Sequence, residues 1–136
     1  MDEEARHARG WERLTRLNNT TTPRVVDRVR SVAPHAARWI AEFGYGDAYD
    51  EDRMSARDRQ LVTIGALTAM GGAEAQLDVH MGIALNLGMA PADIAEAIAH
   101  CIPYCGFPRA INAFDVLAAL LERRGIELPG STQETN

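Results

Sequence analysis

Apolar residues recur every three or four positions along nearly the whole chain, and this spacing is the feature that most restricts the possible folds. Ile94, Ile98 and Ile102 show it clearly. Such spacing is the period of an amphipathic helix, whereas a half-buried strand alternates every second residue. The sequence shows neither that alternation nor an internal repeat. It therefore predicts an all-α fold of six to seven helices.

Glycine and proline residues divide this helical pattern into segments. Pro23, Pro34 and Pro91 each fit the first turn of a helix, and Gly88 and Gly125 fit the position just after one. Residues 44–54 are polar and contain glycine, so we expect a break there. The expected helices cover residues 2–17, 24–32, 34 to 43, 55 to 71, 72 to 87, 91 to 103, where Pro103 ends or kinks the helix, and 109 to 124.

The length of 136 residues fits one domain with a sizeable core. We expect that domain to span residues 1–128, followed by a polar disordered tail over 129–136. The charged start of the chain lacks the apolar core of a secretory signal, and no apolar run reaches the roughly 18 residues of a membrane span. We therefore expect a cytoplasmic protein without a membrane partner.

The charge pattern argues against nucleic acid as a partner. The net charge is −5, and all 14 basic residues are arginines, so a Schiff-base or P-loop lysine is excluded within this chain. Residues 85–100 have the layout of a helix-turn-helix. Their second helix carries Asp93 and Glu96 but no arginine, which is improbable for a DNA-recognition helix.

The two cysteines, Cys101 and Cys105, stand four residues apart with Pro103 between them. This spacing is not the C-x-x-C of redox and zinc-ribbon motifs. We interpret both as small buried apolar residues rather than as a disulfide. Zinc-binding motifs of the H-E-x-x-H type are also missing from the sequence, so no metal site is predicted.

His80 is the strongest candidate for acid–base chemistry. It lies at the edge of an apolar stripe beside Met81, so the ring should be partly buried. A histidine there is either a core residue with its hydrogen bonds satisfied or a proton-transfer group. Gln76 lies one turn earlier and faces the same way. Glu74, six residues before His80, fits the acidic first turn of a helix.

A second candidate region is the aromatic break from Tyr104 to Pro108. Tyr104 offers a hydroxyl, and Gly106 lets the backbone approach another group closely. Arg109 follows at a helix N-terminus, where a cation is unfavourable, and this placement hints at an anionic partner. The same segment could equally be a plain structural corner.

Several segments, taken in order, resemble the carboxymuconolactone decarboxylase family. The resemblance covers roughly residues 9 to 122. The matching pieces include Glu42-Phe43-Gly44, Ser55 to Leu61, Leu61-Val-Thr-Ile64, Gln76-Leu77-x-x-His80, Ala84-Leu85-x-x-Gly88, Ile94-x-Glu96-x-Ile98-x-His100 and Tyr104-x-Gly106-Phe107-Pro108. The resemblance implies an alkyl hydroperoxidase D-like helical fold that forms homotrimers or homohexamers. It also implies loss of CO2 from a carboxylated lactone, without cofactor or metal, during aromatic degradation.

Two departures from the family pattern refine this expectation. The peroxidase-like branch of the family carries C-x-x-C before its histidine, and those positions here are Ala73 and Gln76. Peroxidase activity is therefore not expected. The decarboxylases commonly have glutamate four residues before the histidine, where this chain has Gln76. A glutamine can orient an imidazole but cannot supply the negative charge that raises its basicity.

The resemblance leads to a mechanistic hypothesis for a small carboxylated lactone as substrate. His80, oriented by Gln76, would donate a proton, and Tyr104 would bind the developing oxyanion. The residues expected to bind the substrate are Arg109 or Arg59 for a carboxylate, Trp39, Phe43 and Phe107 as apolar walls, and Glu74 as a compensating acid. The alternatives are an isomerase or cyclase of a natural-product pathway, or an oligomer that binds a ligand without catalysis.

Overall fold

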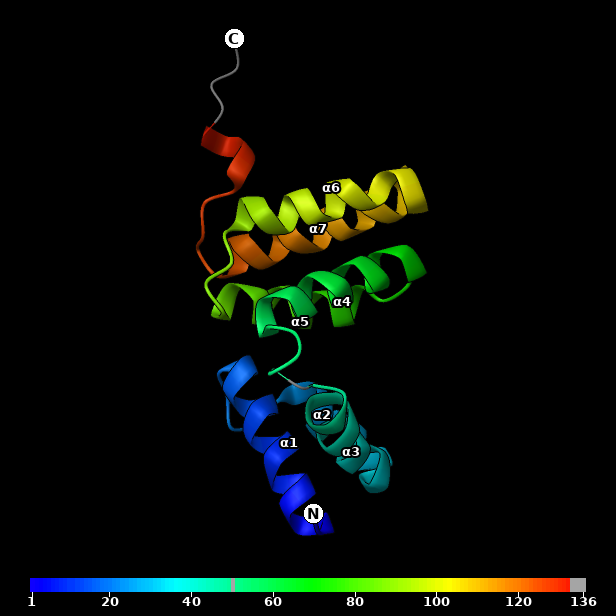
Figure 1. The fold of residues 1–136 in the computed structure, drawn as a ribbon. Helices are drawn as coiled ribbons and strands as arrows, with labels where there is room; N and C mark the ends of the chain where they lie inside the picture. Colours follow the sequence, from blue (N-terminus) through cyan, green and yellow to red (C-terminus); the bar gives the residue numbers. More distant parts are fainter. Residues whose placement is uncertain (50, 133–136) are drawn as a thin grey trace. The chain divides into compact units, whose positions relative to one another are not determined.

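The computed structural model describes residues 1–49 and 51–132. In these residues, all regular secondary structure is helical (Figure 1). The all-α prediction is therefore confirmed. The elements are α1 (Glu3–Asn18), α2 (Arg24–Val32), α3 (Pro34–Trp39), the π-helix η1 (Ile40–Asp47), α4 (Ala56–Met70), α5 (Glu74–Asn86), α6 (Pro91–Cys105), α7 (Phe107–Arg123) and the 3-10 turn η2 (Pro129–Thr132).

The chain divides into two compact units, Met1–Ala56 and Arg57–Asn136. Each unit has its own cluster of buried apolar side chains. The single domain expected over residues 1–128 stays a prediction. None of the described helices is long and apolar enough to cross a membrane.

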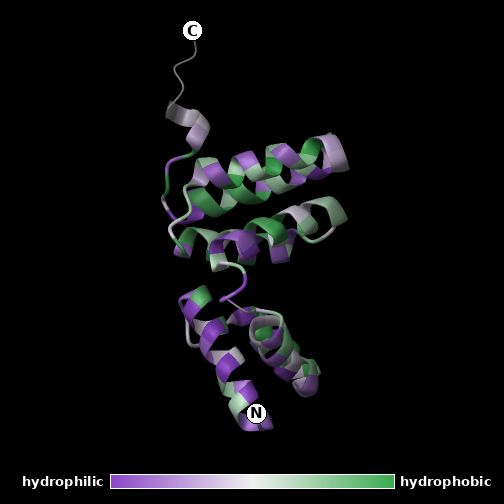
Figure 2. Ribbon diagram, in the orientation of Figure 1, coloured by the Kyte–Doolittle hydropathy of each residue, from purple (hydrophilic) through white to green (hydrophobic). Residues whose placement is uncertain are grey.

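The first unit depends on a very close approach between α1 and η1. Gly10 lies on the buried side of α1, where a Cβ atom would overlap the carbonyl oxygen of Ala41 and lie 2.5 Å from its carbon. Leu14, Val26 and Ala41 belong to the small apolar core that forms around this crossing. α1 is largely hydrophilic in Figure 2, and its buried residues are Gly10, Leu14 and Leu17.

Charged side chains surround the same crossing. Glu42 of η1 is buried, and its Oε1 atom lies 2.7 Å from Arg38 Nη2. Arg6 Nη2 lies 2.7 Å from Asp47 Oδ2, and this hydrogen-bonded guanidinium holds the pKa of the Asp47 carboxyl below its usual range. The ion pairs therefore compensate the charges of the acidic groups in η1.

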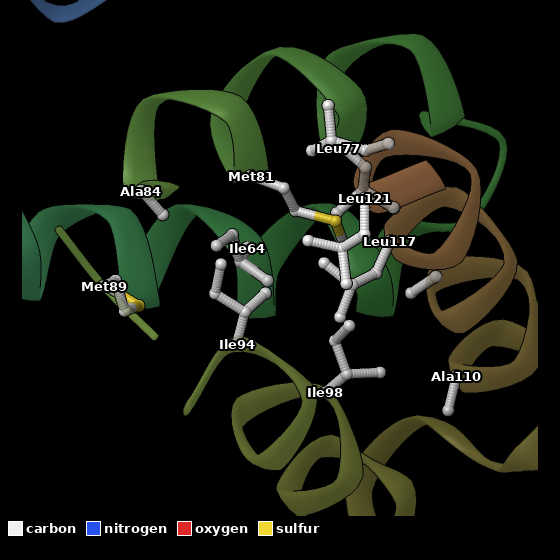
Figure 3. Close-up of a cluster of buried hydrophobic side chains, with 12 residues drawn as sticks. Ile64, Leu77, Met81, Ala84, Met89, Ile94, Ile98, Ala110, Leu117 and Leu121 are labelled. Carbon is white, nitrogen blue, oxygen red and sulfur yellow. The ribbon is translucent and has the colours of Figure 1, made fainter. Parts of the chain in front are cut away.

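The second unit contains the larger apolar core, formed by one face of each helix from α4 to α7. In Figure 3, Met81 of α5 lies among side chains from the other three helices, including Ile64, Ile94 and Leu121. Each of these side chains is almost completely shielded from solvent. Burial of apolar area is the main force that holds such a helical unit together. The core fixes the register of α4 against α5, on which the candidate site depends.

Two predicted boundaries are wrong. The helix expected to end at Phe43 continues as η1 to Asp47, because the chain changes to π-helical hydrogen bonding and carries Gly44 and Gly46 within the helix. Pro103 does not end α6, which runs on to Cys105. Pro103 lacks the N–H that would bond back to the preceding turn, and α6 ends only two residues after it.

The break between α6 and α7 is a single residue. Gly106 has a φ of +85°, and α7 begins directly after it, two residues before the expected start at Arg109. Residues Pro129–Thr132, at the start of the expected disordered tail, form the turn η2, and the remainder of that tail lies outside the described residues.

Candidate functional site

His80 is held by a hydrogen bond to Gln60, which comes from a different helix. His80 lies on α5, and its Nδ1 atom is 3.0 Å from Oε1 of Gln60 on α4. An amide oxygen only accepts hydrogen bonds, so Nδ1 carries the proton and donates it. The other ring nitrogen, Nε2, then carries the lone pair, which is the part of a neutral imidazole that can take up a proton.

Burial sets the protonation state of this imidazole. It lowers the pKa of His80 from 6.5 to about 4, because the charged form loses its hydration. The ring is therefore neutral at pH 7 and acts first as a base. The predicted role as proton donor requires His80 to take up a proton before it can give one.

The buried side of α4 explains why Gln60 is in place. This side consists of Gln60, Ile64 and Thr68, spaced by one turn each, and two of the three are polar. Gln60 is completely buried, and a buried amide needs partners for its polar atoms. The sequence analysis did not identify Gln60. Its position one turn before Ile64, on the apolar stripe of the helix, was the available signal.

The two predicted partners of His80 on its own helix lie elsewhere. Gln76 and Glu74 are both exposed in the first two turns of α5. The orienting role of Gln76 and the compensating role of Glu74 stay predictions. In the structure, His80 Nδ1 donates its hydrogen bond to Oε1 of Gln60.

The aromatic corner places three predicted site residues close together in the chain. Tyr104 is 78% exposed and Phe107 is 65% exposed, so neither belongs to the core of the second unit. Arg109 extends over the turn between α4 and α5, where a Cβ atom on Gly71 would lie 3.0 Å from its Nε atom. The prediction that Arg109 lies at a helix N-terminus is confirmed.

The remaining predicted residues are distributed over both units. Arg59 precedes Gln60 on α4 and is half-buried. Trp39 and Phe43 are exposed in the first unit, so their role as walls of a pocket at His80 stays a prediction. In the part of the chain that the structure covers, no group of three or more histidine, cysteine or acidic side chains could hold a metal ion.

The shifted pKa of His80 makes stability depend on pH. The unfolded chain binds more protons than the folded one between pH 6.5 and about pH 4, so acidification through this range favours unfolding. Between pH 7 and pH 4, we expect the free energy of unfolding to fall by about 3 kcal/mol more in the wild type than in His80→Asn. Denaturant titrations followed by far-UV circular dichroism at pH 7 and pH 4 measure this difference. Equal losses in the two proteins would show that His80 titrates normally in the folded state.

Comparisons with known proteins show what this chain is similar to. The sequence profile of the carboxymuconolactone decarboxylase family matches residues 34–119. The 4-carboxymuconolactone decarboxylase of Acinetobacter baylyi is 27% identical over 127 residues, which cover 93% of this chain and 94% of that protein.

Two further relatives match a shorter stretch. The nitrosuccinic acid decarboxylase of Metarhizium robertsii is 31% identical over 77 residues, or 57% of this chain and 53% of that protein. An uncharacterised 15.0 kDa protein of Paracoccus denitrificans is 33% identical over 78 residues, or 57% of this chain and 58% of that protein. The profile match spans more than half of the chain and includes both Gln60 and His80. The chain therefore belongs to the carboxymuconolactone decarboxylase family.

Proposed function

We propose that this protein is a cofactor-independent decarboxylase of a small carboxylated lactone or a related dicarboxylic acid. The observation that carries the proposal is the hydrogen bond between His80 and the buried Gln60, which holds the partly buried imidazole in one tautomer, with its pKa lowered to about 4. Two relatives named as decarboxylases, one similar over nearly the whole chain, support the same reaction class.

The chemistry requires one proton to reach carbon after CO2 leaves. A carboxylate bound beside Nε2 favours the imidazolium form, because an opposite charge nearby raises the pKa of a histidine. His80 therefore takes up a proton as the anionic substrate binds. Loss of CO2 leaves an electron pair that is delocalised over the substrate. His80 then returns its proton to one carbon of this delocalised anion. Gln60 keeps the ring in one tautomer throughout.

Other residues complete the proposed site. Arg109 or Arg59 binds a carboxylate through the two N–H groups of its guanidinium. Tyr104 donates a hydrogen bond to the oxyanion that forms as CO2 departs. Phe107 excludes water. The protein acts as a homotrimer or homohexamer in the cytoplasm, on a route of aromatic degradation.

Turnover of defined acids tests the proposal. The purified protein is incubated with 4-carboxymuconolactone and, separately, with nitrosuccinic acid, and NMR follows the loss of substrate and the product. We expect release of CO2 from one of them, with a single solvent deuteron bound to carbon in the product when the reaction runs in D2O. A product that keeps all its carbon atoms would instead support an isomerase or cyclase. No turnover of either acid by folded protein would count against this substrate class.

A further inference from the structure

Two free thiols lie on one side of the last two turns of α6, outside the residues used in the proposed reaction. Cys101 and Cys105 are both partly exposed. Cys101 donates a hydrogen bond to the carbonyl of Ala97 at 3.3 Å, and Cys105 donates one to the carbonyl of Gly106 at 3.7 Å. These weak contacts leave both sulfur atoms free to react.

The helix brings the two residues within reach of each other. Residues four apart on an α-helix have Cα atoms about 6 Å apart on the same face, within the roughly 4.4–6.8 Å that a disulfide spans. Gly65 of α4 faces Cys101, and a Cβ atom on the glycine would be in ordinary van der Waals contact with the sulfur at 3.7 Å. The missing side chain therefore leaves Cys101 room to change its rotamer, as closing the bond requires.

The end of α6 can also yield. Closing a disulfide across one turn requires the two Cβ atoms to approach, which distorts the helix. Pro103 lies between the cysteines and has no N–H to bond back to the preceding turn. Cys105 is the last residue of the helix, and Gly106 follows with a φ of +85°. The distortion thus affects the last turn of α6, which has one backbone hydrogen bond fewer and is not continued by further helix.

We propose that Cys101 and Cys105 are a site of reversible oxidation, where a hydroperoxide converts the two thiols into an intrahelical disulfide. The Cys105 thiolate attacks the peroxide oxygen, forming a sulfenic acid and releasing water or an alcohol. The Cys101 sulfur then displaces the hydroxyl group from Cys105, and a second water leaves as the S–S bond forms. The peroxide is reduced by two electrons, and the two thiols are oxidised. Burial raises the pKa of the Cys101 thiol, which fits Cys105 as the first to react.

Intact-mass measurement of the full chain treated with hydrogen peroxide tests the site. We expect the monomer to lose about 2 Da and to regain it on treatment with dithiothreitol. The chain has only two cysteines, so a monomer with this loss must contain the Cys101–Cys105 bond. Circular dichroism before and after treatment checks that the helices persist.

Single variants separate the two steps. Cys101→Ser is expected to stop at a sulfenic acid on Cys105, which dimedone captures, without the 2 Da loss. Cys105→Ser is expected to lose most of the dimedone labelling under the same conditions. Wild-type protein that only gains oxygen atoms, forms disulfide-linked dimers or stays unchanged would overturn the proposal, because each result means that the two sulfur atoms do not meet.

Discussion

Asparagine in place of His80 is expected to lower kcat at least about a hundredfold on the acid that the wild type decarboxylates. The asparagine side chain keeps an N–H that can bond to Gln60 Oε1, but it has no nitrogen that takes up a proton near neutral pH. The loss should therefore appear in kcat more than in KM. Steady-state kinetics measure it, and circular dichroism with a thermal melt shows that the fold is retained.

Matched variants at two glutamines separate the partner found in the structure from the one suggested by sequence spacing. Gln60→Leu removes the acceptor for His80 Nδ1–H and is expected to lower kcat about tenfold to a hundredfold. Gln76→Leu changes an exposed side chain on the helix of His80 and is expected to cost much less. Gln60→Glu places a negative charge against the ring and raises its pKa, so the alkaline limb of the pH–rate profile should move to higher pH.

A His80→Asn protein with full activity would contradict the proposed mechanism. His80 would then be a core histidine whose hydrogen bond to Gln60 serves packing alone, which was the alternative interpretation of the sequence. An equal loss in the Gln60→Leu and Gln76→Leu proteins would instead mean that both amides position the ring. A shifted limb in the pH–rate profile of Gln60→Glu would show that the side chain at this position acts on the His80 ring. A general loss of stability would leave the limb at its wild-type pH.

Helix spacing predicted the elements well because it depends on neighbours three and four residues away. His80 could be predicted to be partly buried from Met81 and the apolar positions around it. Gln76 was the predicted partner because it lies one helical turn away. Gln60 lies 20 residues earlier in the chain, and only the packing of α4 against α5 brings it to the ring. Tertiary contacts of this kind leave no local pattern in one sequence.

The errors at helix ends have the same origin. Pro103 was expected to end or kink a helix, yet α6 continues through it for two more residues, to Cys105. The π-helix η1 was not expected, because its residues do not differ by type from those of an α-helix. Its wider turns are stabilised by contacts with α1, and above all by the close approach at Gly10.

Alanine in place of Gly10 is expected to destabilise the first unit by about 3 kcal/mol or more. In a solvent-exposed helix the same change usually stabilises by close to 1 kcal/mol, because alanine is the better helix former. Here the added methyl group would overlap the backbone of Ala41, which cannot rotate away as a side chain could. The clash must therefore push α1 away from η1. Both tryptophans, Trp11 and Trp39, lie in this unit, so denaturant unfolding followed by tryptophan fluorescence reports on it directly.

Gly44→Ala is the matched control for this change. Gly44 lies within η1, the other helix of this crossing, but a Cβ atom there meets no other atom within 4 Å. We expect the midpoint of its fluorescence-monitored unfolding to stay the same or rise slightly. The alanine reduces the conformational freedom of the unfolded chain and causes no clash in the folded one. If Gly10→Ala unfolds at the same denaturant concentration as Gly44→Ala, α1 and η1 do not touch at Gly10. The close approach would then not be what holds the π-helix in place.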